Sequence, residues 1–150
     1  MLIVRDLMQR EVVTVTRETP VSKATAILRL RGFRHLPVLE KGELVGVFSF
    51  TDACHSEESA GHRQYCPYNR GDEEMILDSL TVEEEMSKLV ITTKPDAPAS
   101  EAARLMADQK IGCLPVVDKG KLVGIITTTD ILRAFAREQE GRPKTEARAN

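Results

Sequence analysis

Hydrophobic and polar positions follow the same order twice along this chain. Residues 4–52 align without a gap with residues 82–130, so that Met8 is matched by Met86. The strings Leu-Pro-Val, Lys-Gly, Leu-Val-Gly and Thr-Asp recur at matching places in both copies. A long period that occurs only twice is typical of two supersecondary units that bury a face against each other, and not of a solenoid.

The pattern predicts the same elements in each copy. A short β-rich stretch comes first, and a helix with an apolar stripe follows Pro20 or Pro98, where proline suits the first helical turn. Thr19 is a plausible N-cap for the first of these helices. Two strands joined by a glycine-bearing turn come next, and a final helix begins near Asp130. We therefore predict two β-α-β-β-α units, which make an α/β (α+β) fold.

The similarity between the two copies is lost after Asp52, and this loss determines the predicted domain boundaries. The next residues are polar and contain Gly61, so the last helix of the first copy is expected to be short. The chain then divides into four parts: a first unit at 1–58, a connecting loop insert at 59–78, a second unit at 79–140 and a disordered tail at 141–150.

Composition and charge exclude several classes of protein. The chain has 41% hydrophobic and 4% aromatic residues, which predicts a folded protein with an aliphatic core. Its net charge of −2 argues against nucleic-acid binding through bulk positive charge. No apolar run approaches the roughly 18 residues of a membrane span, and charge appears too early for a signal peptide. With an odd number of cysteines, three, we expect a cytoplasmic protein with reduced thiols.

The second strand of each copy ends in the motif Gly-x-x-Ser/Thr-x-x-Asp. A carboxylate at such a strand-to-helix junction can accept two hydrogen bonds from a ribose diol, and the hydroxyl can donate to a phosphate or ribose oxygen. The N-terminus of the following helix adds free N–H groups that favour a phosphate. Threonine and aspartate are also common helix caps, and capping needs no ligand. The motif residues are Gly46, Ser49 and Asp52, and then Gly124, Thr127 and Asp130.

Two in-register strings carry a family resemblance. HLPVLEKGELVGVFSFTD and CLPVVDKGKLVGIITTTD, each in a β-α-β-β-α unit, resemble the tandem CBS-domain proteins (cystathionine-β-synthase-type domains). The resemblance covers about residues 1–58 and 79–139. It implies a pseudo-twofold module of two packed units, which commonly dimerises and often binds adenine nucleotides in the clefts between units.

The resemblance also implies roles for particular residues. In the family, the matching hydroxyl and carboxylate residues contact ribose and phosphate, which assigns these contacts to Ser49, Asp52, Thr127 and Asp130. The adenine pocket is built by the stretch before the first helix and the segment before Leu-Pro-Val. One site would then use Val13, Thr14, Arg34 and His35, and the other Ile91, Thr92, Gly112 and Cys113.

The second motif, which ends at Asp130, is the better candidate for a nucleotide-binding site. The helix after Asp130 is regular, and Arg133 lies one turn further on, where it is either a phosphate contact or a solvated surface charge. The first motif departs from the pattern, because Phe50 lies within it and its helix is short. His35 is either a half-buried histidine bonded to a backbone carbonyl or a contact to bound nucleotide.

The insert carries a possible metal or redox cluster. Cys54, His55, His62 and Cys66 have the right donor atoms for zinc, but their spacing includes no Cys-x-x-Cys pair. A surface loop with free thiols is the alternative interpretation.

These observations lead to one principal function and two alternatives. The principal one is a stand-alone regulatory module that binds an adenine nucleotide, AMP above ADP or ATP, or S-adenosylmethionine, and signals to an unidentified regulated protein as a homodimer. The alternatives are a ligand-free dimerising interaction scaffold and a metal or redox protein. We expect no enzyme and no catalytic cofactor, because no nucleophile–base pair or glycine-rich phosphate loop occurs.

Overall fold

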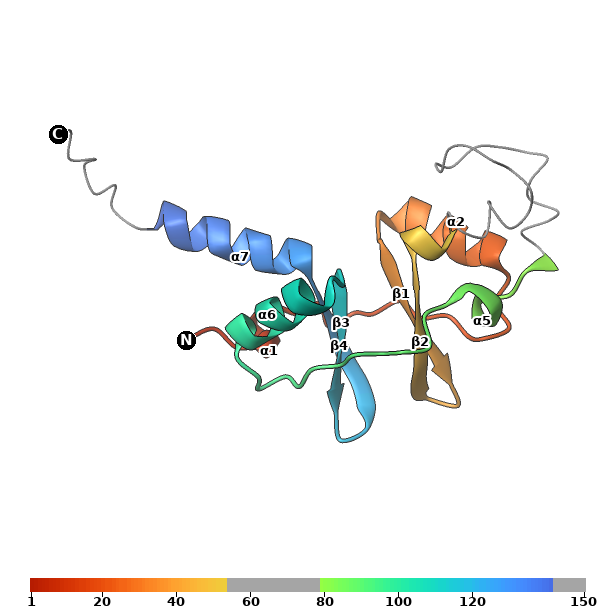
Figure 1. Ribbon diagram of the computed structural model, residues 1–150, viewed down its shortest axis with the longest axis horizontal. Helices are drawn as coiled ribbons and strands as arrows, with labels where there is room; N and C mark the ends of the chain where they lie inside the picture. The colour runs from red at the N-terminus through yellow and green to blue at the C-terminus, as the bar shows by residue number, and fades with distance from the viewer. Residues whose placement is uncertain (54–78, 142–150) are drawn as a thin grey trace.

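The computed structural model describes residues 1–53 and 79–141 (Figure 1). The insert at 59–78, the cluster of Cys54, His55, His62 and Cys66, and the tail beyond residue 141 lie outside the described residues. The described part holds two halves with the same plan. Figure 1 shows β1 and β2 beside α2 and α5, and β3 and β4 beside α1, α6 and α7.

Each half is centred on a two-stranded antiparallel hairpin. In the first, β1 (His35–Glu40) pairs with β2 (Glu43–Ser49), and in the second, β3 (Cys113–Asp118) pairs with β4 (Lys121–Thr127). Each turn consists of a Lys-Gly pair in which both residues have positive φ, 49° and 81° in the first and 50° and 78° in the second. Positive φ at both central residues matches the twist of the flanking strands, so the predicted glycine turns are confirmed.

The long helices flank the hairpins. They are α2 (Val21–Arg31), α6 (Ala99–Gln109) and α7 (Thr128–Glu140). Pro20 is itself the N-cap of α2, one residue later than the predicted Thr19. The Thr19 hydroxyl instead accepts a hydrogen bond from the Thr16 N–H at 3.0 Å, which closes the turn before the helix.

The β-rich stretches at 12–15 and 90–93 form single bridges and not strands. Val15 bridges Val38, and Thr93 bridges Val116, in both cases in parallel. Val15 donates to the carbonyl of Pro37 at 3.1 Å, and its own carbonyl accepts from Leu39 at 2.9 Å. Val12 and Val13 of the first stretch, and Val90 and Ile91 of the second, line the clefts described below. The two packed α+β units predicted from the repeat are confirmed.

The two repeats exchange their opening segments. The short helix α1 (Val4–Leu7) lies against the second half, and α5 (Val82–Glu85) lies against the first. The Val4 N–H donates to the carbonyl of Ala97 at 2.9 Å, and the Val82 N–H donates to the carbonyl of Thr19 at 2.9 Å. The ranges 1–58 and 79–140 therefore describe the repeats along the chain, whereas each core in space contains residues from both.

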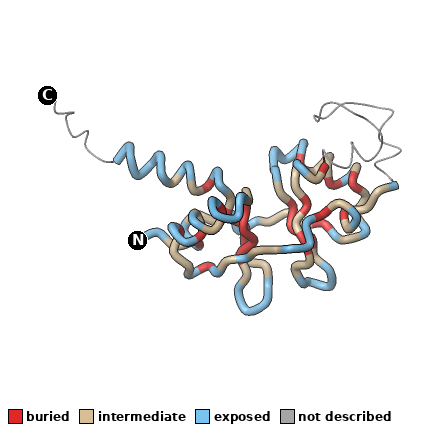
Figure 2. The backbone as a smooth tube through the Cα atoms, in the orientation of Figure 1, coloured by how far each residue is buried: buried red, intermediate tan, exposed pale blue. Residues whose placement is uncertain are grey.

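Each core is mostly aliphatic and mixes the two repeats, and the first also contains the fully buried ring of Phe48. Figure 2 shows the buried residues gathered on the hairpins and on the inner faces of the helices, with much of α7 exposed. Val4 and Val82 are both fully buried. The first core includes Leu28, Leu36, Phe48 and Val82, and the second includes Val4, Met106, Leu114 and Ile126. No helix within residues 1–53 or 79–141 is long and apolar enough to cross a membrane.

The motif glycines serve this exchange. A Cβ on Gly124 would lie 2.7 Å from the sulfur of Met8 and 2.8 Å from the carbonyl oxygen of Gln9. A Cβ on Gly46 would lie 2.5 Å from the sulfur of Met86. Each glycine thus lets the end of an opening segment cross a strand of the other repeat, and the repeated Met–Gly pairs have a packing role.

We expect Gly124→Ala to lower the free energy of unfolding by about 1–3 kcal/mol, since the new methyl group must displace the backbone at Gln9. Chemical denaturation measures this change. Gly141→Ala is the matched control and should leave stability nearly unchanged, because the nearest atom to its Cβ is 3.6 Å away. Equal stability of the two variants would contradict the packing role.

Candidate functional site

Three pockets between the repeats share His35 and Gly112 in their linings. Two of them contain a complete Ser/Thr–Asp pair: the arginine cleft, of about 480 Å³, and the cysteine cleft, of about 240 Å³. The third, of about 590 Å³, adjoins both, because its lining includes Phe33, Arg34 and Thr128 together with Ser49 and Thr51. The arginine cleft is lined by Gln9, Glu11, Val12, Val13, Arg31, Phe33, Arg34, Thr127, Thr128, Thr129, Asp130 and Arg133, among others. The cysteine cleft is lined by Val47, Ser49, Thr51, Asp52, Ser87, Leu89, Val90, Ile91, Lys110, Ile111, Cys113 and Pro115.

Each cleft is built from both repeats. One repeat supplies the Gly-x-x-Ser/Thr-x-x-Asp motif, and the other repeat supplies the opposite wall. Val13 and Arg34 of the first repeat face Thr127, Asp130 and Arg133 of the second. In the cysteine cleft, Ile91 and Cys113 of the second repeat face Ser49 and Asp52 of the first. Thr14 and Thr92 line neither of these two clefts.

Thr127 and Asp130 form the capping box of α7. The Asp130 Oδ2 atom accepts from the Thr127 N–H at 2.9 Å and from the Thr127 hydroxyl at 2.8 Å, while the Asp130 N–H donates to that hydroxyl at 3.4 Å. The Asp130 Oδ1 atom accepts from Gln9 Nε2 at 3.0 Å. The carboxylate is 8% exposed, so these bonds offset the cost of burying its charge.

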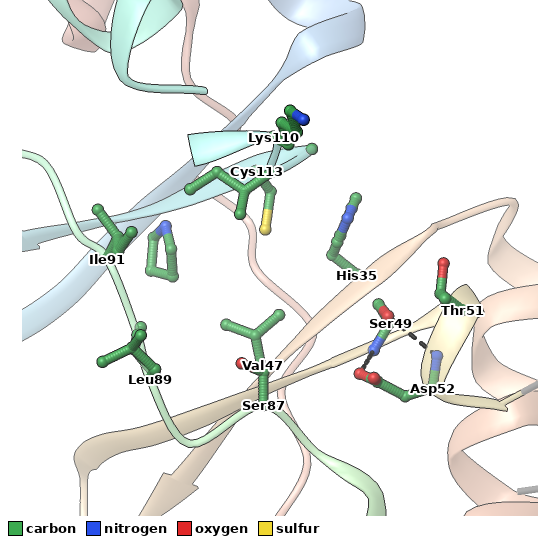
Figure 3. A pocket seen from close by; sticks show the side chains of 14 residues that line it. His35, Val47, Ser49, Thr51, Asp52, Ser87, Leu89, Ile91, Lys110 and Cys113 are labelled. Atoms are coloured by element: carbon green, nitrogen blue, oxygen red, sulfur yellow. Dashed lines mark hydrogen bonds between the residues drawn. The ribbon is translucent and has the colours of Figure 1, made fainter. Parts of the chain in front are cut away.

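Ser49 and Asp52 make the corresponding pair in the cysteine cleft. The Ser49 N–H donates to Asp52 Oδ2 at 2.7 Å, and the Asp52 N–H donates to the Ser49 hydroxyl at 3.1 Å. Residues 50–53 are helical up to the point where the described segment ends. Figure 3 shows these two bonds at the edge of the cleft.

The capping role of the motif is therefore real in both copies, and it leaves binding capacity. A carboxylate oxygen has two lone pairs, and Asp130 Oδ1 uses one of them for Gln9. Because Asp130 is held by Thr127 on one side and Gln9 on the other, it is oriented before any ligand arrives. Capping therefore leaves acceptor capacity on the carboxylate of Asp130.

His35 is the shared wall of the two clefts. A Cβ on Gly112 would lie 2.9 Å from His35 Cε1, so the imidazole lies directly against the backbone of the second repeat. Burial, and secondarily the positive charge of Arg34, lower the pKa of His35 below its ordinary value of 6.5. The ring is thus neutral at pH 7 and offers both a donor and an acceptor nitrogen.

Cys113 occupies the position in the second repeat that His35 occupies in the first. Figure 3 shows its side chain on the cleft wall, with His35 and Val47 around the same space. Burial raises the pKa of the Cys113 thiol to about 12, so it is a neutral, weakly polar wall and no nucleophile at physiological pH. Among residues 1–53 and 79–141, no group of three His, Cys, Asp or Glu side chains is placed to hold a metal ion.

Sequence reasoning missed several lining residues. Gln9, Glu11 and Arg31 line the arginine cleft, and Lys110 and Leu89 line the cysteine cleft. A signal for Gln9 was available, because it directly follows the repeated Met8, as Ser87 follows Met86. Arg31 and Lys110 lie at or just past the last turn of α2 and α6, next to the segments named as pocket walls.

Comparisons with known proteins agree with this geometry. A family model described as "CBS domain" matches residues 4–57 and 82–137. The chain is 33% identical over 139 residues to inosine-5'-monophosphate dehydrogenase of Korarchaeum cryptofilum, a match that covers 89% of this chain and 25% of that enzyme. The chain spans between a quarter and about half the length of the first curated relatives.

Two solved structures are similar over nearly the whole chain. The CBS domain pair of protein MJ0100, in complex with 5'-methylthioadenosine and S-adenosyl-L-methionine, has a TM-score of 0.77 and 27% identity. The match covers 92% of this chain and 98% of that one. CBSX2 in complex with AMP has a TM-score of 0.73 and 26% identity, and the match covers 93% and 99%.

We expect NMR titration to place the His35 pKa below 6.5, and Arg34→Gln to raise it, because the variant removes a positive charge that disfavours the imidazolium. Arg104→Gln, on the exposed face of α6, is the charge-matched control and should leave that pKa in place. A His35 pKa at or above 6.5 would contradict the buried setting described here.

Proposed function

Since this chain belongs to the CBS domain family, we propose that it is a regulatory module that binds an adenosyl ligand in the clefts between its repeats and signals to a regulated polypeptide. AMP is the first candidate ligand, and S-adenosylmethionine is the second. The single observation that carries the proposal is the crossed construction of the clefts, in which a ligand contacts both repeats at once. Binding then favours one relative placement of the two halves.

The arginine cleft has the groups that a nucleoside monophosphate requires. Val13 and Phe33 supply apolar surface for a base, and Asp130 supplies a carboxylate for a ribose diol. Arg133 and the N-terminus of α7 supply positive potential for a phosphate. Its volume of about 480 Å³ lies within the usual range for small-molecule sites, roughly 300–1,000 Å³.

A path for the signal begins at Asp130. Its carboxylate holds Gln9, whose backbone bridges Ile125 with N···O distances of 2.8 and 2.9 Å. Gln9 ends the opening segment that α1 begins, and α1 belongs to the core of the second half. A ribose that draws on Asp130 therefore perturbs the attachment of the opening segment.

One observation favours self-association as a second function of the same module. Leu132 and Phe135 of α7 are 66% and 60% exposed and lie three residues apart, on one face of the helix. Figure 2 shows most of this helix in the exposed colour. We propose that a second copy of the chain covers this face and forms a homodimer, with or without ligand.

The ligand proposal predicts a thermal shift with AMP or S-adenosylmethionine. A ligand at about 100 times its Kd should add about 2.7 kcal/mol to the free energy of unfolding. Asp130→Ala should abolish this gain, because it removes the ribose acceptor. Calorimetric binding and thermal unfolding measure the two effects.

Asp6→Ala is the matched control for loss of a cap. Asp6 is the N3 residue of the α1 capping box and accepts from the Ile3 N–H at 3.0 Å, but it lines neither cleft. The variant should lose about 1 kcal/mol of stability and keep the ligand response. The absence of any response to AMP, ADP, ATP, 5'-methylthioadenosine and S-adenosylmethionine would refute the proposed function.

The dimer proposal predicts that the double variant Leu132→Lys with Phe135→Lys sediments as a monomer, since charges on the shared face would have to be buried. Leu30→Lys is the control, because Leu30 is 82% exposed on α2 and outside the α7 face. It should leave association unchanged. A wild-type chain that sediments as a monomer at tens of micromolar would contradict self-association.

A further inference from the structure

We propose that the two clefts take different ligands: the arginine cleft selects its adenosyl ligand by the length of a phosphate chain, and the cysteine cleft takes an adenosyl ligand without phosphate. This inference rests on the proposed function, because it assigns ligand classes to the same two clefts. The observation behind it is a difference in charge and volume between clefts that the repeat would otherwise make alike.

Three guanidinium groups meet at the arginine cleft from both repeats. Arg31 ends α2, Arg34 directly precedes β1, and Arg133 lies in the second turn of α7. All three are exposed at the rim, and within residues 1–53 and 79–141 none forms an ion pair. Arg17 shows the contrast, since it is paired with both Glu40 and Glu83.

The carboxylates of the arginine cleft do not neutralise these three charges. Asp130 is committed to Thr127 and Gln9, and Glu11 is the other acidic residue in the lining. Three positive and two negative side chains leave an excess of positive charge, to which the N-terminus of the 13-residue helix α7 adds. Guanidinium groups at a rim can follow a chain of phosphates by changing rotamer, and each can bind phosphate oxygens in a bidentate manner.

Within residues 1–53 and 79–141, the lining of the cysteine cleft has no such excess. Its charged lining residues are Lys110 and Asp52, whose charges cancel, and Cys113 is a neutral thiol. The rest of its wall is largely aliphatic, with Val47, Leu89 and others, and it encloses about half the volume of the arginine cleft.

The difference in charge between the two clefts arises at equivalent positions of the two repeats. Arg34 aligns with Gly112, and Arg31 aligns with Gln109. Arg31 and Arg34 therefore have no cationic counterpart at the equivalent positions of the second repeat, and they line the cleft that also holds Arg133. Among the described lining residues, the cysteine cleft presents one lysine to a phosphate chain, whereas the arginine cleft presents three guanidinium groups.

The test is calorimetric titration of the full chain with adenosine, AMP, ADP, ATP and 5'-methylthioadenosine. We expect one site whose affinity rises roughly tenfold with each added phosphate, as charge-assisted hydrogen bonds accumulate. This site should weaken as salt is raised, because exposed charges are screened. A second site should bind 5'-methylthioadenosine with little dependence on salt.

The variants assign each site to a cleft. The triple variant Arg31→Gln, Arg34→Gln and Arg133→Gln should bind adenosine as the wild type does but lose the preference for ATP over AMP. It should also retain the 5'-methylthioadenosine site. Lys110→Gln, in the cysteine cleft, and Arg104→Gln, on α6 outside both clefts, are the matched controls and should keep the phosphate preference.

The outcomes separate this inference from the proposed function. Binding of adenosyl compounds with equal affinity for adenosine and ATP, or a phosphate preference that survives in the triple variant, would overturn the inference and leave the proposed function intact. A phosphate preference that Lys110→Gln abolishes would also overturn it. If neither these five compounds nor S-adenosylmethionine binds, both the proposed function and the inference fail.

Discussion

Neither hairpin can cover its own buried face, and the rest of the structure depends on this constraint. Val4 and Val82 are fully buried, yet each fills the core of the half to which its own repeat does not otherwise belong. Full burial of a valine side chain contributes about 1.5–3 kcal/mol, and the opening segments add backbone bonds such as Val4 to Ala97. The exchange therefore ties the halves together through apolar contact and hydrogen bonding alike.

The exchange also determines where the clefts lie and what lines them. Once each opening segment crosses to the other half, the stretch that follows it must return between the hairpins. That return places Val13 opposite Thr127 and Ile91 opposite Ser49. His35 and Gly112, which lie against each other, line both clefts. Both clefts are thus by-products of how the cores are completed.

Much of the fold could be predicted from the sequence, because its signals are local. The Lys-Gly turns, the strands around Leu-Pro-Val and Leu-Val-Gly, and the helices after Pro20 and Pro98 each rest on residues close in the chain. The exchange could not be predicted, because Val4 packs equally well in either core as far as its own neighbours indicate. For the same reason, local patterns could nominate motif residues such as Asp130 and wall residues such as Val13, both of which line a cleft, but not the crossed pairing of the two repeats.

The side chains of the site also differ in whether they could be predicted from the sequence. Asp130 was recognisable because its motif recurs, whereas the position of Gln9 after the repeated Met8 did not reveal its contact with a residue far along the chain. The twofold exchange has a last consequence for the history of the molecule. A free-standing single repeat would have to swap its opening segment with a second copy, and both clefts would then carry identical side chains. Joining the two copies in one polypeptide makes this swap intramolecular, so that it no longer depends on concentration. It also allows each copy to acquire substitutions independently of the other. Position 34 can therefore be an arginine although its counterpart, position 112, is a glycine.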